Sequence, residues 1–104
     1  MTVLHLDDTD FDKAVSFSSE PVLVDFSATW CGPCKVLEPI LERMAASAGG
    51  RFRIAKVDID DAPETARRFG VRGAPTLVVL RQGKEIARHL GVASEARIRE
   101  LLSS

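Results

Sequence analysis

Residues 21–35, PVLVDFSATWCGPCK, are the most informative stretch of this chain, because the pattern of a buried strand is followed within them by the start of a helix. The apolar run of residues 21–28 is typical of a central parallel strand that is covered on both faces, although Asp25 interrupts it. The chain then turns and reaches the sequence CGPC at residues 31–34. We therefore expect a strand, a turn and a helix that begins at the two cysteines.

The helix that follows has one apolar face, which ends at the glycine pair of residues 49–50. The apolar residues recur at helical spacing: Val36, Leu37, Ile40, Leu41, Met44, Ala45 and Ala48. Glycine just past the last periodic residue is a usual end for a helix. Pro39 lies inside the helix and predicts a kink, because proline lacks an N–H and its ring crowds the preceding turn.

The segments on either side predict further strands and helices. Residues 3–6 are a short strand candidate, and Thr9 followed by Asp12 resembles a capping box that opens a helix ending near residues 18–19. The inward-facing residues of that helix should be Phe11, Ala14 and Val15. Residues 52–57 predict a second buried strand.

The last part of the chain predicts a helix, a hairpin and a final helix. Pro63 suits the first turn of a short helix that runs to Phe69. Two strands, residues 76–80 and 85–90, are close enough to form an antiparallel hairpin, with its turn at Gln82 and Gly83. An amphipathic helix capped by Ser94 should then cover residues 94–102. The fold class is therefore α/β, with a mixed five-stranded sheet, parallel strands plus one hairpin, and helices on both faces.

Composition indicates a globular protein and excludes several kinds of partner. The chain has 104 residues, 45% of them hydrophobic and 28% charged, so we expect a single domain over residues 1–104 with one core. A net charge of −1, with acidic and basic residues interleaved, offers no electrostatic footprint for nucleic acid or anionic lipid. The N-terminal residues do not read as a signal peptide, and no run could span a bilayer. We therefore expect a cytoplasmic monomer with no nucleic-acid or membrane partner.

The two cysteines lie three residues apart, and a reducing compartment leaves catalysis, metal binding or simple burial as explanations for them. Three residues along a helix advance the chain by about 4.5 Å and bring both cysteines to one face, which is close enough for a disulfide. The Cys31 sulfur would lie at the helix N-terminus, where free N–H groups and the helix dipole stabilise a thiolate. Pro33 suits the first turn, and Gly32 leaves the sulfur approachable.

On this hypothesis Cys31 is the attacking thiol of a dithiol/disulfide oxidoreductase, and Cys34 is the resolving thiol. Cys31 attacks a substrate disulfide to form a mixed disulfide, and Cys34 then displaces the reduced substrate while closing the internal bond. An external reductant must afterwards regenerate the dithiol. Because Pro33 adds no charge that would stabilise the thiolate, as a histidine there would, the pair is predicted to be comparatively reducing.

Three stretches of the chain resemble the thioredoxin family: VDFSATWCGPCK at residues 24–35, KVDID at 56–60 and GVRGAPTLVVLRQG at 70–83. The resemblance covers essentially the whole chain and implies the thioredoxin-like fold. It also implies a protein-disulfide reductase that uses a Cys31–Cys34 redox pair, with no bound cofactor or metal, on disulfide-containing protein substrates. The partner that recharges it would be an NADPH-dependent thioredoxin reductase.

The resemblance further implies roles for residues around the cysteines. Asp25 and Lys56 would form a partly buried polar pair, since an aspartate in a core strand is costly unless it is paired. A carboxylate of raised pKa behind Cys34 could accept the proton of that thiol. Pro75 would be a cis-proline whose loop leaves backbone groups free to pair with an extended substrate peptide. The substrate rim would comprise Trp30, Ile59, Gly73, Ala74, Pro75, Gly91 and Val92.

Plainer interpretations of these residues remain open. The cysteines could be an inert buried pair, or could join His5 and His89 at a zinc site. Asp25 could be a structural, ion-paired carboxylate, and Trp30 could be a core aromatic. Many bacterial members of the family carry a tryptophan where this chain has Ser27, which leaves the activity unaltered. An oxidase or isomerase would share the scaffold, and a binding module could use the apolar rim alone.

Overall fold

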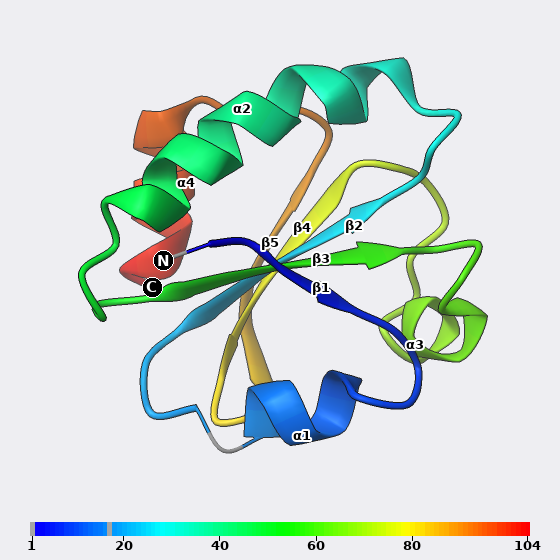
Figure 1. Ribbon diagram of the computed structural model, residues 1–104, viewed down its shortest axis with the longest axis horizontal. Coiled ribbons are helices and arrows are strands. Elements are labelled where there is room, and N and C mark those ends of the chain that lie inside the picture. Colours follow the sequence, from blue (N-terminus) through cyan, green and yellow to red (C-terminus); the bar gives the residue numbers. More distant parts are fainter. Residues whose placement is uncertain (1, 17) are drawn as a thin grey trace.

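The computed structural model describes residues 2–16 and 18–104, and these form one mixed sheet with helices around it (Figure 1). In chain order the elements are β1 (Leu4–Leu6), α1 (Phe11–Ser16), β2 (Val22–Ser27), α2 (Gly32–Ala46), β3 (Arg53–Asp58), α3 (Pro63–Arg68), β4 (Thr76–Arg81), β5 (Lys84–Leu90) and α4 (Glu95–Leu102). The described part of the chain has no helix with the length and apolarity that a membrane crossing needs. The α/β class expected from the sequence is confirmed.

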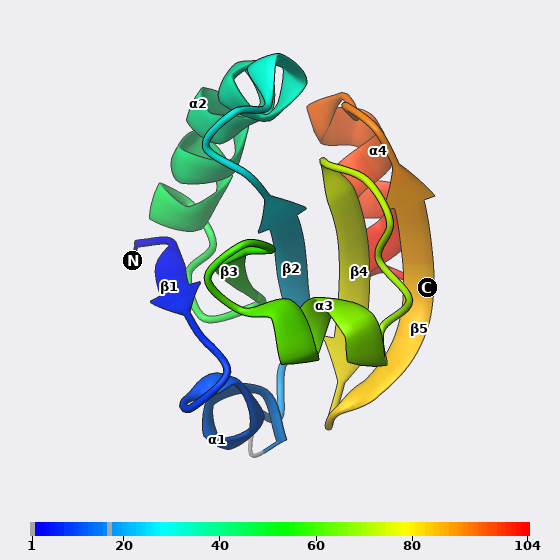
Figure 2. The ribbon, with the colours of Figure 1, turned by 90° about the vertical axis from the view of Figure 1, so that its right-hand side faces the viewer.

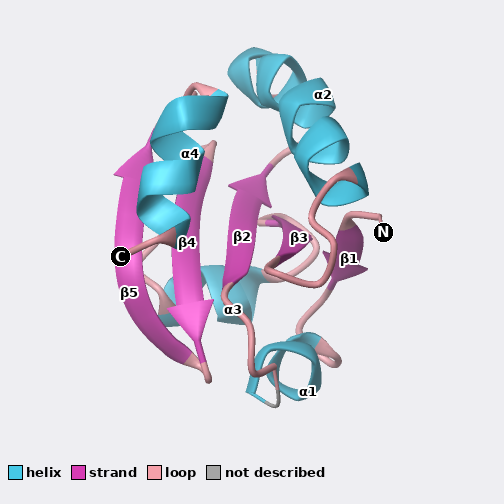
Figure 3. Cartoon of the chain, turned by 90° about the vertical axis from the view of Figure 1, so that its left-hand side faces the viewer, coloured by secondary structure: helices cyan, strands magenta, loops and turns pink. Residues whose placement is uncertain are grey.

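Strand β2 lies at the centre of the sheet, whose strand order is β1-β3-β2-β4-β5. It pairs in parallel with β3 and antiparallel with β4, and all six of its residues are buried. β1 extends the parallel side next to β3, and β5 forms the antiparallel hairpin with β4 (Figure 3). A strand covered on both faces needs apolar residues at successive positions, which explains the nearly continuous apolar run before the cysteines.

The two faces of the sheet carry separate cores. α2 and α4 cover one face, and α1 and α3 cover the other (Figures 1 and 2). Leu23 of β2 packs with α2 and α4, whereas its neighbours pack with α1 and α3: Val22, Val24 and Phe26. Because side chains alternate along a strand, Asp25 lies on the α2 face. In β3, Ile54 packs on the α2 face, so Lys56 lies there too.

The start of α1 differs from the prediction, because the capping box is formed by Asp7 and Asp10 and not by Thr9 and Asp12. The N–H of Asp7 donates to Asp10 Oδ1 at 2.7 Å, and the N–H of Asp10 donates to Asp7 Oδ1 at 3.2 Å. Thr9 donates its N–H and its hydroxyl to the same Asp7 oxygen. A carboxylate is the stronger acceptor, so Asp7 takes the cap and Thr9 becomes a donor.

Other predicted turns and caps are confirmed. Ser94 caps α4, since its hydroxyl accepts the N–H of Arg97 at 3.2 Å. Gln82 and Gly83 both have positive φ, 51° and 82°, which is the conformation of a tight hairpin turn whose twist matches the strands. α2 ends at Ala46, two residues before the end of its apolar pattern. The helix continues through Pro39, and the kink there stays a prediction.

Candidate active site

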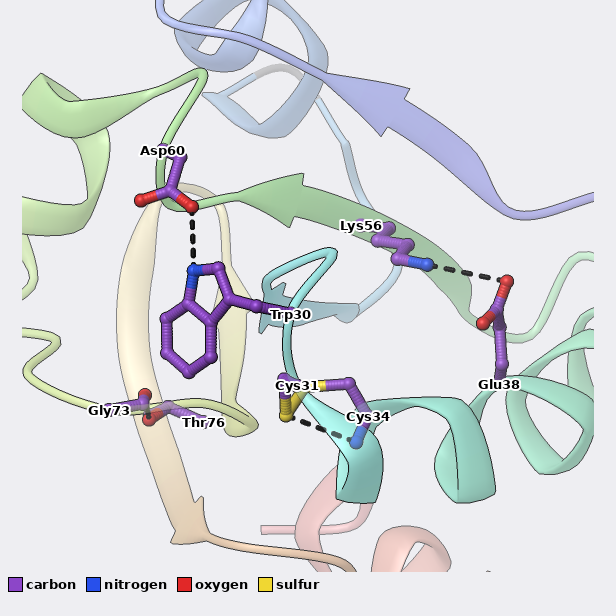
Figure 4. Close-up of a disulfide and its surroundings, with 8 residues drawn as sticks. All are labelled: Trp30, Cys31, Cys34, Glu38, Lys56, Asp60, Gly73 and Thr76. Atoms are coloured by element: carbon purple, nitrogen blue, oxygen red, sulfur yellow. Dashed lines mark hydrogen bonds and ion pairs between the residues drawn. A yellow bond between two sulfur atoms is a disulfide. The ribbon is translucent and has the colours of Figure 1, made fainter.

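Cys31 and Cys34 form a disulfide at the first turn of α2 (Figure 4). Their Cα atoms are 5.4 Å apart, which lies within the range that a disulfide spans. Cys31 is the N-cap residue of α2, with an extended backbone, and its Sγ accepts the N–H of Cys34 at 3.2 Å. The sulfur of Cys31 thus occupies the position that a serine or aspartate oxygen takes in an ordinary helix cap.

Gly32 and Pro33, between the cysteines, form the first turn of α2. Proline needs no hydrogen-bond partner in this turn because it has no N–H to satisfy. A Cβ atom added to Gly32 would meet no other atom within 4 Å, so the glycine lies at an open surface. Pro33 therefore suits the start of the helix, and Gly32 leaves that start open to another molecule from solution.

Trp30 lies on the surface beside the disulfide, with 66% of its area exposed. Its indole N–H donates to Asp60 Oδ2 at 2.8 Å, a contact that ties the ring to the loop after β3 (Figure 4). The structure therefore excludes Trp30 as a core aromatic. Asp60 was not singled out from the sequence, although it ends the KVDID stretch, because nothing in that pattern indicates an indole partner.

The loop before β4 lies against the cysteines. Ala74 and Ile59, both partly buried, pack against the apolar cluster of Ala28, Cys31 and Cys34. The peptide bond between Ala74 and Pro75 is cis.

This loop has fewer free backbone groups than the sequence suggested. The carbonyl of Pro75 accepts the N–H of Gly91 at 2.8 Å, and the carbonyl of Gly73 accepts the hydroxyl of Thr76 at 2.7 Å. Among the described residues, the N–H of Gly73 and both the N–H and the carbonyl of Ala74 lack a partner in this segment. A substrate strand that pairs with this loop can therefore use the backbone of Ala74 and the N–H of Gly73.

Asp25 is buried on the α2 face of β2, beside its expected polar partner Lys56, but the ion pair that Lys56 makes is with another residue. The two residues are register neighbours on β2 and β3 and share the α2 face. The Lys56 amine instead lies 3.4 Å from Oε1 of Glu38, on α2 (Figure 4). Asp25 is only 1% exposed, and its Oδ1 has no hydrogen-bond partner among the described residues. Sequence periodicity did not reveal Glu38, because the contact joins two distant elements.

The surroundings of Asp25 raise its pKa to about 7, from the ordinary value of 3.8. Burial is the main cause, because it penalises the charged carboxylate. The positive charge of Lys56 lowers the pKa, and the negative charge of Glu38 raises it. Asp25 therefore exchanges its proton near neutral pH, where an exposed aspartate would already be charged.

The chemistry open to this site is the exchange of a disulfide with thiols. The bond between Cys31 and Cys34 can be broken by a thiolate and remade by expelling one, with a transfer of two electrons each time. A cysteine pair of this kind at a helix N-terminus, on a mixed sheet covered by helices, defines the class of dithiol/disulfide oxidoreductases.

Comparison with known proteins identifies the family. Residues 2–104 match the family model described as Thioredoxin. The chain is 44% identical over 102 residues to the thioredoxin of Acidithiobacillus ferridurans, covering 98% of this chain and 94% of that protein. It is 47% identical over 83 residues to the thioredoxin of Thiocapsa roseopersicina, covering 80% and 91%, and 42% identical over 100 residues to that of Mycobacterium tuberculosis, covering 96% and 86%. The chain belongs to the thioredoxin family.

Family membership and the Cys31–Cys34 disulfide together establish the activity. The chain is a protein-disulfide reductase that works by reversible dithiol/disulfide exchange. It acts on disulfide-containing substrates and is recharged by a reductase. Members of this family need no prosthetic group, because the redox-active disulfide itself carries the electrons.

Proposed function

We propose that this chain is a general protein-disulfide reductase of the cytoplasm, a monomer with one domain over residues 1–104, in which Cys31 attacks and Cys34 resolves. The observation that supports these roles for the two cysteines is a hydrogen bond, in which the N–H of Cys34 donates to the Cys31 sulfur at 3.2 Å. That N–H and the positive end of the α2 dipole would stabilise a thiolate on Cys31 after reduction. Cys34 lies deeper in the first turn, and no N–H of the described residues donates to its own sulfur.

The reduction of a substrate disulfide takes two steps. The Cys31 thiolate attacks one sulfur of the substrate disulfide, whose S–S bond breaks to leave a mixed disulfide and a substrate thiolate. Cys34 then loses its proton and attacks the Cys31 sulfur, which expels the second substrate thiolate and closes the internal disulfide. The substrate gains two electrons and the cysteine pair loses two. We propose an NADPH-dependent thioredoxin reductase as the partner that returns them.

Asp25 is the proposed acceptor for the Cys34 proton, directly or through one water. Three observations support this role: the carboxyl faces the helix that carries Cys34, its Oδ1 has no partner among the described residues, and its pKa is about 7. A base whose pKa lies near the working pH is present in its charged form and still binds a proton well.

The proposed substrate surface surrounds the disulfide and comprises Trp30, Ile59, Gly73, Ala74, Pro75, Gly91 and Val92. Its support lies in the exposed Trp30, the 41% exposed Val92 and the unpaired backbone of Ala74. An extended substrate segment would pair with Ala74 as an added strand while its side chains pack against the indole.

Alkylation of the reduced protein tests the order of attack. With a single cysteine left, the Cys34→Ser protein should react with iodoacetamide at a midpoint pH below about 8.5, the value for a free thiol. The Cys31→Ser protein serves as the matched control and should react more slowly at neutral pH. If Cys34 were the faster thiol, the proposed roles would have to be exchanged.

A further inference from the structure

The ion pair between Lys56 and Glu38 is a feature of the site that neither the reaction scheme nor the resemblance to the family uses. The Lys56 amine lies 3.4 Å from Oε1 of Glu38, and the two side chains are 22% and 46% exposed. Glu38 lies four residues after Cys34, one turn farther along α2. The pair therefore joins the helix that carries the resolving cysteine to the strand beside Asp25 (Figure 4).

Asp25 meets this ion pair across a small cavity of about 20 Å³. The cavity is lined by Val3, His5, Asp25, Glu38, Leu41, Glu42 and Lys56. A volume of this size is enough for about one water molecule, and its charged lining could hydrogen-bond it. The unpartnered Oδ1 and the ion pair thus share one confined polar space.

Several charged or titratable groups face Asp25 from the elements around it. β3 supplies Lys56, β1 supplies His5, and α2 supplies Glu38 and Glu42 as well as the cysteine pair at its start. On the fourth side β4 contributes Leu77, which is not ionisable. Lys56 is the only lysine or arginine among the described residues that line the cavity, and its position decides how much positive charge Asp25 meets.

We propose that Glu38 is a positioning residue of the exchange site: it holds the Lys56 ammonium and so keeps that charge from forming a direct pair with Asp25. The proton of Asp25 then remains exchangeable near neutral pH, where Cys34 must be deprotonated. The opposite signs with which Lys56 and Glu38 act on the pKa of Asp25 agree with this arrangement. The functional part of the inference rests on the proposed role of Asp25 as the acceptor of the Cys34 proton.

Removing the charge of Glu38 has two effects on the pKa of Asp25, and both lower it. Glu38→Gln removes a negative charge near the carboxylate and also frees Lys56 to move toward it. Each effect favours the charged form, so the midpoint of the Asp25 titration should fall by about 0.5 to 1 pH unit. Lys56→Met should raise the midpoint. In a protein that already carries Lys56→Met, Glu38→Gln should lower the Asp25 midpoint by less than it does in the natural chain, because no lysine remains that could move toward Asp25.

Carbon-13 NMR of the Asp25 carboxyl measures this midpoint directly, in the oxidised protein, where the cysteines do not titrate. Glu42→Gln is the matched control, since it removes the same charge from the same helix and cavity but breaks no ion pair with Lys56. The proposal predicts a larger shift for Glu38→Gln than for Glu42→Gln. An unmoved midpoint in Glu38→Gln, a shift equal to that of Glu42→Gln, or an undiminished shift in the Lys56→Met background would overturn it.

The pH profile of mixed-disulfide resolution separates this inference from the proposed role of Asp25. If both hold, the rate in Glu38→Gln rises at lower pH than in the natural chain, by the same displacement that NMR gives. A purely structural role for Glu38 would change the stability but leave this profile in place. If Asp25→Asn resolves the mixed disulfide at the natural rate, the role of Asp25 fails, while the NMR midpoints still decide whether Glu38 controls its titration.

Discussion

Cys31 and Asp25 lie in environments that favour opposite charge states. The Cys31 sulfur receives an N–H at the end of a helix, which favours its anion. The Asp25 carboxyl is buried and its Oδ1 is unpartnered among the described residues, which favours its neutral form. Burial of Asp25 therefore has a free-energy cost, which its proposed role as proton acceptor would account for.

The cost of Asp25 should appear as a pH dependence of stability. Its pKa is raised from 3.8 to about 7 in the folded protein, so between these values the folded chain holds a proton that the unfolded chain has lost. Stability must then fall as pH rises from about 4 to 7. Asp25→Asn removes this loss of stability. The change that the substitution makes in the free energy of unfolding should therefore be more favourable above pH 8 than at pH 4, by up to about 4 kcal/mol.

Urea unfolding of both proteins at pH 4, 6 and 8 measures the difference. A constant difference across this range would mean that Asp25 has an ordinary pKa in the folded state.

Trp30 should contribute to substrate binding and little to the core. Because its ring is largely exposed, Trp30→Ala should leave the thermal unfolding temperature nearly unchanged while raising the KM for a protein disulfide about tenfold. Asp60→Asn weakens the contact that orients the indole and should raise KM by a smaller factor. Steady-state reduction of a disulfide-bonded protein gives both values, and an unchanged KM in Trp30→Ala would remove this residue from the substrate surface.

Helix α3 begins without a side-chain cap from its own N-cap residue. Its N-cap residue, Ala62, offers no side-chain acceptor. The carboxylate of Asp8, more than fifty residues earlier, instead accepts the N–H groups of Glu64 and Thr65 and the Thr65 hydroxyl. The segment between β1 and α1 therefore holds the start of α3 in place.

Asp8→Ala should destabilise the protein more than an exposed ion pair would suggest, because it leaves two helix N–H groups without their acceptor. The loss of a cap in a domain of this size lowers the unfolding temperature by about 5 °C. Asp12→Ala is a suitable control, since the carboxylate of Asp12 makes an exposed ion pair with Arg68. Calorimetry at pH 7 compares the two, and equal losses would rule out the capping role of Asp8.

Local sequence patterns predicted most of the helices and strands. They did not predict the contacts between side chains of different elements. The start of α2 at the cysteines, the Ser94 cap and the hairpin turn follow from residues close in sequence, and all three are confirmed. The capping box of α1 was predicted at the wrong residues because two candidate caps, Asp7 and Thr9, lie two positions apart. Which of them caps the helix depends on acceptor strength, which the spacing does not show. The pairing of Lys56 with Glu38 could not be foreseen, since periodicity does not show which side chains meet across α2 and β3.

The fold brings the parts of the site together from four separate segments of the chain. The cysteines come from the start of α2, Asp25 from the centre of β2, Trp30 from the loop between them, and Ala74 from the segment before β4. The strand order puts β2 between β3 and β4, so the loops that follow β2 and β3 meet the loop that precedes β4. Two apolar clusters, one on each face of the sheet, fix these positions.

The reduction potential of the Cys31–Cys34 pair distinguishes a disulfide reductase from an oxidase or a binding module. The oxidised and reduced forms are equilibrated against a dithiol buffer, and the reduction of a disulfide-bonded protein is followed in parallel. Because Pro33 adds no charge to stabilise the reduced form, we predict a potential below about −260 mV, beyond the reducing end of the range that extraction methods give for the glutathione pool, together with catalytic turnover. A potential above that pool, or the absence of turnover, would contradict a disulfide reductase and favour an oxidase or a binding module.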